Sequence, residues 1–182
     1  MIYIVSKKRK LDNIIKEYPT AIICDITSKS PNSLVRLSPF FPHGGIPVPF
    51  SPGLFSQSVE GVWQGLKVFE NADVSLDVLE IASMSGIKRT CKKYGRVIGH
   101  RKGYYSNEII NYVSAKHEIY IPTYIWMLEN KSLDIVQRMA KSANEHDIVL
   151  LDYNTCEDFD SPSQPLSHAA ILKKYITEHF HI

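Results

Sequence analysis

The chain has 182 residues, of which 44% are hydrophobic and 22% charged, and its formal net charge is +2. These values are ordinary for a globular protein and exclude extensive disorder. The length predicts one domain, residues 1–182, large enough to bury a core without disulfide or metal support. No apolar run approaches the roughly 18 residues that a membrane span needs.

The N-terminus has the reverse order of a secretory signal. Its apolar residues 1–5 are followed at once by basic residues 7–10, whereas a signal peptide places its basic residues first. The three cysteines, Cys24, Cys91 and Cys156, are widely spaced and odd in number, which argues against a disulfide framework. We therefore expect a cytoplasmic protein with no membrane partner.

No metal and no cofactor is expected from the sequence. The histidines show no ligand spacing with one another; they include His43, His100, His117, His146 and His168. A catalytic cysteine working with a remote histidine stays open as an alternative.

The first third of the chain predicts a strand, a helix and a second strand. Residues 2–5 read as a strand, residues 10–18 as an amphipathic helix ending before Pro19, and residues 21–26 as a buried strand. The unit is short for a dinucleotide-binding βαβ motif and has no glycine fingerprint, so we exclude that fold.

Residues 38–52 hold five of the ten prolines and predict a rigid loop without regular structure. Gly44 and Gly45 favour a turn within it. The phenylalanines, above all Phe40, either stack on a planar ligand ring or anchor the loop to the core. His43 is a second candidate for ligand contact in this loop.

Residues 58–70 predict a helix with two faces, capped by Ser58. Val59, Val62, Trp63, Leu66 and Phe69 fall on one apolar arc, and Glu60, Gln64 and Lys67 line up opposite. Gly61 and Gly65 beside the polar stripe each cost about 1 kcal/mol relative to Ala. Either a neighbouring backbone or a ligand must come close to that flank.

A basic segment follows a short predicted helix at residues 75–83. Seven of the 21 Lys and Arg residues lie between positions 88 and 102, and no Asp or Glu occurs from 81 to 107. A field of that sign favours phosphate, and the three glycines interleaved with it favour the approach of backbone N–H groups to an anion. The alternative is a solvated charged surface.

The last third predicts helices over residues 119–141 with a break near 130–131, and a buried strand over 147–153. An acidic loop comes after Asp152, and a terminal helix begins at Ser167. Together these elements predict an α+β fold, predominantly helical, with a small β-sheet.

Three segments together, residues 37–42, 58–67 and 88–96, resemble the NADAR superfamily, an N-glycosidase fold linked to NAD and ADP-ribose metabolism. The family helix has the pattern Val-Glu-His-aromatic-aromatic-Gln-x-x-Lys, and Val59, Glu60, Trp63, Gln64 and Lys67 match it. Gly61 stands where the family has His, which removes a catalytic or orienting imidazole. The resemblance covers residues 37–100, and the family's Trp-Gly element near the acidic loop is missing.

The resemblance implies hydrolysis of the C–N bond between a ribose and a base in an ADP-ribosylated or phosphoribosyl substrate. Glu60 would stabilise the oxocarbenium ion and activate water, and Gln64 would hold a sugar hydroxyl or the water. Lys67 would keep Glu60 ionised or attack as an amine. The remaining expected roles are base stacking for Phe40 or Trp63, phosphate neutralisation for Lys88, Arg89, Lys92 and Arg96, and proton donation for Asp152 or Asp158.

Two other functions stay open. The same residues would serve a protein that binds a nucleotide-derived ligand without cleaving it, consistent with Gly61 in place of His. Alternatively, residues 88–102 would bind nucleic acid, with an affinity that falls steeply with salt. The sequence leaves the oligomeric state open.

Overall fold

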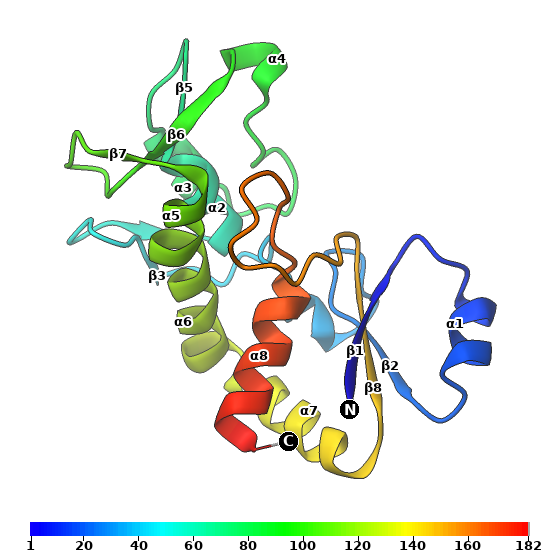
Figure 1. Cartoon of the computed structure of the whole chain (residues 1–182). Helices are drawn as coiled ribbons and strands as arrows, with labels where there is room; N and C mark the ends of the chain where they lie inside the picture. The colour runs from blue at the N-terminus through cyan, green and yellow to red at the C-terminus, as the bar shows by residue number, and fades with distance from the viewer. Residues whose placement is uncertain (182) are drawn as a thin grey trace. The chain divides into compact units, whose positions relative to one another are not determined.

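The fold is α+β, as predicted, in a computed structural model that describes residues 1–181 (Figure 1). Helices make up 40% of the chain and strands 16%, arranged in three small sheets. The chain packs as two compact units. Unit 1 comprises Met1–Ser38 and the chain from Leu128 onward, and unit 2 comprises Pro39–Met127.

Unit 1 contains a parallel sheet with the strand order β1-β8-β2. Its strands are β1 (Ile2–Ser6), β2 (Ile22–Asp25) and β8 (Ile148–Asp152). Its helices are α1 (Leu11–Glu17), the 3-10 helix η1 (Ser33–Leu37), α7 (Leu133–Glu145) and α8 (His168–Phe180). All five residues of β8 are buried, which confirms the prediction for this strand and explains its nearly continuous apolar run.

The two faces of this sheet are covered by different helices. Val149 and Leu151 of β8 pack with Val5 of β1 and Ile14 of α1. On the other face, Ile148 lies near side chains of α7, because successive strand residues point to opposite faces. The predicted strand β2 is an edge strand, and its Ile22 is 39% exposed, so its apolar run does not mark burial on both faces.

Unit 2 is built from short elements. Its strands are β3 (Ile46–Pro47), β4 (Phe55–Ser56), β5 (Lys67–Phe69), β6 (Val97–Arg101) and β7 (Ile109–Ile110). Its helices are α2 (Val59–Gly65), α3 (Leu76–Leu79), α4 (Cys91–Tyr94), α5 (Tyr112–Ala115), the π-helix η2 (Lys116–Tyr120) and most of α6 (Ile121–Lys131). The antiparallel sheet β5-β6-β7 was not predicted.

Several predicted boundaries need correction. The helix expected over residues 75–83 is a single turn, α3. The loop expected over 38–52 contains β3, which pairs with β4 across a turn containing Pro49 and Gly53. The long helix over 119–141 is interrupted at Ser132, as expected.

Among residues 1–181, no helix is both long and apolar enough to cross a bilayer.

Candidate functional site

Helix α2 begins where the sequence predicts and ends early. The Ser58 side chain accepts a hydrogen bond from the Gly61 N–H at 2.9 Å, which confirms the N-cap. The helix stops at Gly65, and Lys67–Phe69 forms strand β5 instead of a further turn. The reason is tertiary, because these three residues pair with β6, while the Phe69 N–H donates to the Ala72 carbonyl and the Lys67 carbonyl accepts from Arg89. Lys67 therefore does not extend the helical stripe of Glu60 and Gln64.

The polar face of α2 is buried rather than solvated. Glu60 is 7% exposed and Gln64 is 4% exposed. Gln64 Nε2 donates to Glu60 Oε1 at 2.8 Å, and Gln64 Oε1 accepts from the Arg89 N–H at 3.1 Å. The amide thus orients one carboxylate oxygen and is itself oriented by the chain at Arg89. Buried carboxylates that are held in this way are common in functional sites.

The two glycines of α2 make room for neighbouring protein. A Cβ atom at Gly61 would lie 2.4 Å from Ser56 Oγ, and one at Gly65 would lie 2.7 Å from Leu79 Cδ2. Both distances are too short for a side chain to fit without movement of the neighbour. Close packing of β4 and α3 therefore explains the glycines, and space for a ligand is not needed to explain them.

Trp63, Lys67 and His100 form an aromatic and cationic cluster beside this face. The ring centroids of Trp63 and His100 are 3.8 Å apart, and Lys67 Nζ lies 5.7 Å from the centroid of the Trp63 ring. Lys67 and His100 are directly paired across β5 and β6, so their side chains share one face of the sheet. The rings of Tyr112 and Tyr120 meet Trp63 edge-on, at 5.9 and 5.5 Å.

The amine of Lys67 is shifted toward its neutral form. Burial lowers the pKa of Lys67, and the negative charge of Glu60 opposes this shift. A lysine with a lowered pKa and a carboxylate within electrostatic reach can exchange protons with a bound ligand more easily than a solvated pair.

His100 is the site residue that sequence reasoning missed. It is 1% exposed, and neither ring nitrogen has a hydrogen-bond partner among residues 1–181. Burial, followed by the positive charge of Lys67, lowers the pKa of His100 to about 3. The Trp63 backbone opposes this shift with a smaller effect. The imidazole is therefore neutral at physiological pH, and its burial leaves no signal in the sequence.

Arg89, which was expected to bind phosphate, donates to backbone carbonyls in this structure. Its Nη1 donates to the carbonyls of Gln64 and Lys67 at 3.2 and 2.7 Å, and its Nη2 donates to that of Asp73 at 2.6 Å. The guanidinium thus caps the end of α2 and ties it to the following loop. Both of its terminal nitrogens are used by backbone carbonyls, so little capacity remains for a phosphate.

The other predicted basic residues lie on the surface of unit 2. Lys88 Nζ lies 5.3 Å from the ring centroid of Phe40, which brings these two candidates together. Lys92 is exposed on α4. Arg96 pairs with Glu70 at 3.2 Å and is 82% exposed. The positive field of this segment is therefore partly compensated.

Two of the three interleaved glycines lie against protein backbone. A Cβ atom at Gly99 would lie 2.5 Å from the Ile110 carbonyl oxygen, and one at Gly103 would lie 2.3 Å from that of Phe50. These two positions let protein backbones approach each other.

His43 of the proline-rich loop is half-buried, with its ring 4.7 Å from that of Phe41.

Asp152 lies in unit 1, at the end of β8. Its Oδ1 accepts from the Tyr153 N–H at 2.7 Å, and its Oδ2 accepts from Ser167 Oγ at 2.6 Å and contacts His168 Nδ1 at 2.9 Å. Burial would raise the pKa of Asp152, but His168 and the hydrogen bonds outweigh burial and lower it. An acid that is held ionised is a poor proton donor, so this network supports a structural role that anchors the start of α8.

The described part of the chain contains no group of three or more His, Cys, Asp or Glu side chains placed to hold a metal ion.

The comparisons with known proteins identify the family of the chain but no individual relative. Residues 6–172 match a family of unknown function, DUF6939. None of the curated proteins and none of the solved structures compared with the chain matched it. Because the match covers well over half of its length, the chain belongs to the DUF6939 family.

Proposed function

We propose that the protein is an N-glycosidase that hydrolyses the C–N bond between a ribose and a base in an ADP-ribosylated or phosphoribosyl substrate. The observation that carries this proposal is the buried Glu60 carboxylate. It is oriented by Gln64 and lies within electrostatic reach of Lys67, whose pKa is lowered by burial. The resemblance of α2 to the NADAR helix supplies the reaction, and the protein would act in the cytoplasm.

In the proposed reaction, the bond between ribose C1 and the base nitrogen breaks, and the bonding electrons leave with the base. Positive charge develops on C1 and the ring oxygen, where a carboxylate such as Glu60 stabilises it. Glu60 then takes a proton from the attacking water, whose oxygen bonds to C1. The base nitrogen receives a proton from solvent and Glu60 returns its proton to solvent, so the sum is water added across the C–N bond.

The described contacts refine the roles of the neighbouring residues. Gln64 uses its carbonyl and one amide hydrogen within the protein, so its main role is to orient Glu60. Trp63 offers the stacking surface for the base, together with Phe40 and Lys88 as a second aromatic and cationic pair. Lys67 is the candidate that favours the ionised form of Glu60, or attacks as an amine. In this proposal Asp152 has no chemical step.

The test compares Glu60→Gln with the unaltered protein on a guanine base that carries ADP-ribose, with products separated and weighed by mass spectrometry. We expect the unaltered protein to release ADP-ribose and the variant to lose at least about a hundredfold in rate. Glu80→Gln is the matched control, because Glu80 is an exposed acid of the same unit. Full turnover by Glu60→Gln in a folded protein contradicts the proposal.

A second candidate function is ligand binding without hydrolysis. It is favoured by Gly61, which stands where the NADAR helix has a histidine. Ser56 lies so close to Gly61 that an imidazole would not fit there. Mass spectrometry of the incubated ligand separates the two functions, because a binding protein returns the ligand intact.

Nucleic-acid binding is a third candidate, supported by the exposed positive charges of Lys88, Lys92 and Lys93. It predicts an affinity for DNA or RNA that falls steeply as salt rises. Absent or salt-independent binding excludes it.

A further inference from the structure

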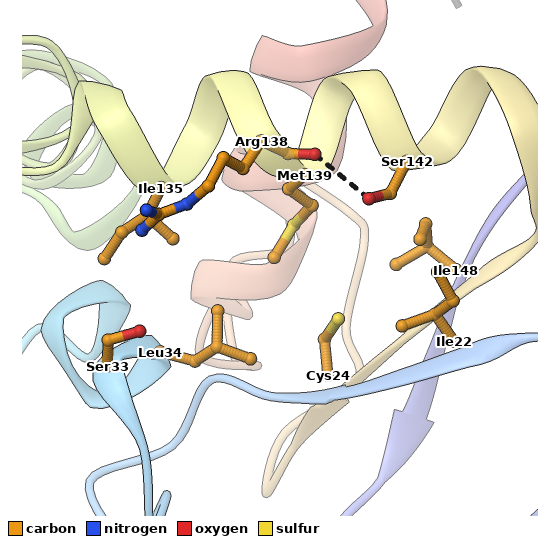
Figure 2. Close-up of a pocket in the computed structure, with 9 residues that line it drawn as sticks. All are labelled: Ile22, Cys24, Ser33, Leu34, Ile135, Arg138, Met139, Ser142 and Ile148. Carbon is orange, nitrogen blue, oxygen red and sulfur yellow. Dashed lines mark hydrogen bonds between the residues drawn. The ribbon is translucent and has the colours of Figure 1, made fainter.

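Unit 1 contains a pocket of about 270 Å³ that plays no part in the proposed function (Figure 2). It lies between α7 and the face of the sheet opposite to α1. Its apolar walls are formed by Ile22, Cys24, Leu34, Ile135, Met139 and Ile148. In Figure 2 the sulfur of Cys24 and the side chain of Leu34 point from one side of the pocket toward Met139 on α7.

These walls carry no charge. Burial raises the pKa of Cys24 to about 11, so its thiol stays protonated at physiological pH and behaves as a small apolar group. Met139 adapts its shape easily, because its side chain is unbranched and polarizable. The walls therefore suit a flexible aliphatic group or an aromatic group of the ligand, and not a charged group.

Among the described residues that line the pocket, Arg138 is the charged one. Its Nη2 contacts Asp134 Oδ2 at 3.2 Å, and Asp134 Oδ1 also contacts Arg36 Nη1 at 3.5 Å. One carboxylate is thus shared by two guanidinium groups, so Asp134 does not serve Arg138 alone. The Arg138 side chain is 68% exposed and is able to turn toward a bound anion.

Two hydroxyl groups complete the polar part of the lining. Ser142 Oγ donates to the Arg138 carbonyl at 3.1 Å, as Figure 2 shows, so this serine is committed to its own helix. Ser33, at the start of η1, lies toward the same end of the pocket as the Arg138 guanidinium in Figure 2. The pocket therefore has a cation and a hydroxyl group at one end and apolar walls along the rest. This arrangement matches an amphipathic anion.

We propose that this pocket binds a small carboxylic acid in its ionised form, with the apolar body between Cys24 and Met139 and the carboxylate on Arg138. Arg presents a planar pair of donors that matches the two oxygens of a carboxylate. The volume is just below the range of about 300–1,000 Å³ typical of pockets for drug-sized ligands, so the occupant is short. Hexanoate is the probe of choice.

The test follows the methyl signal of Met139 by NMR in protein labelled at its methionine methyl groups. The chain has only four methionines, so the Met139 signal is assigned by its loss in Met139→Leu. We expect hexanoate to shift this signal in a saturable way, with a dissociation constant on the order of 1 mM for so small a ligand. The Met84 signal, which comes from unit 2, should stay in place.

Charge is tested by variants, by a neutral probe and by a cationic probe. Arg138→Gln should weaken hexanoate at least about threefold, a modest loss because the side chain is exposed. Lys141→Gln removes an exposed charge from the same helix outside the pocket and should leave the affinity unchanged. Hexanol should bind more weakly than hexanoate, and hexylammonium more weakly still.

Either of two results overturns the proposal. One is a Met139 signal that hexanoate does not shift at about ten times the expected dissociation constant. The other is equal binding of hexanoate and hexylammonium, or of hexanoate to Arg138→Gln and Lys141→Gln, which would show that the guanidinium does not recognise the carboxylate. Neither result bears on the N-glycosidase proposal, whose residues lie in unit 2.

Discussion

Gln64 holds Glu60 through one hydrogen bond of 2.8 Å, and the two side chains lie one helical turn apart on α2. The spacing of four residues places them on the same face, and both are buried. The same amide accepts the Arg89 N–H on its other side. A single side chain therefore connects the candidate catalytic carboxylate to the basic segment.

Replacing Gln64 by Met keeps the length of the side chain and removes both hydrogen bonds. Glu60 Oε1 and the Arg89 N–H then lose a buried partner, and we expect a loss of about 1–3 kcal/mol in the free energy of unfolding, measured in urea. Gln57→Met is the control, because Gln57 is half-buried in the same unit. Equal losses in the two variants would show that the network around Gln64 adds nothing.

Arg89→Lys should destabilise the protein although it conserves the charge. A lysine has no planar fork, so it cannot bond the carbonyls of Gln64, Lys67 and Asp73 together. We expect a loss of at least about 2 kcal/mol in urea unfolding. Arg96→Lys, at an 82% exposed position, should change stability by less than about 0.5 kcal/mol. A phosphate-binding role without a structural one predicts the opposite: normal stability for Arg89→Lys.

Gly61→Ala tests whether packing, and not ligand space, explains the glycine. Alanine favours a helix by about 1 kcal/mol, but its Cβ would meet Ser56 Oγ at 2.4 Å, and we expect a net loss of about 1–3 kcal/mol. Ser56→Ala removes the colliding oxygen, so the two changes together should cost less than the sum of the single changes. Strict additivity in thermal unfolding would contradict the predicted collision.

His100 should make the stability of the protein fall as the pH decreases from about 6.5 toward 3. Its folded pKa of about 3 lies below the ordinary value of 6.5, so in this range the unfolded chain binds a proton that the folded chain does not. One such group contributes up to about 1.4 kcal/mol per pH unit. His100→Phe should flatten this slope in urea unfolding, whereas His146→Asn, at an exposed position, should preserve it.

Asp152 acts in a lower pH range. Its folded pKa is below the ordinary value of 3.8, so its stabilising effect is present above 3.8 and is lost as the pH falls through the folded pKa. At neutral pH, Asp152→Asn leaves His168 without its carboxylate, and we expect a loss of about 3 kcal/mol. The exposed change Glu145→Gln in the same unit serves as the control. A variant that unfolds in urea like the unaltered protein would show that the pair is not stabilising.

Much of unit 1 could be predicted from the sequence because its signals are local. The apolar run of β8, the helical periods of α7 and α8, and the cap at Ser167 all depend on residues close together in the chain. Unit 2 was predicted less well. Its strands are two to five residues long, too short for a periodic pattern, and β5 forms only because β6 returns to pair with it.

The sequence by itself determined the α+β class, the start of α2 at Ser58, and the residues Glu60 and Gln64 as a pair on one face. Only the tertiary structure decided that this face is buried and that Lys67 belongs to a strand. It also decided that Arg89 donates to backbone carbonyls, and that the His100 ring lies 3.8 Å from the ring of Trp63. The reason is physical. The local charge and the hydrophobic periodicity depend on residues that are neighbours in the chain, whereas burial and the partners of a guanidinium depend on segments that meet only in the fold.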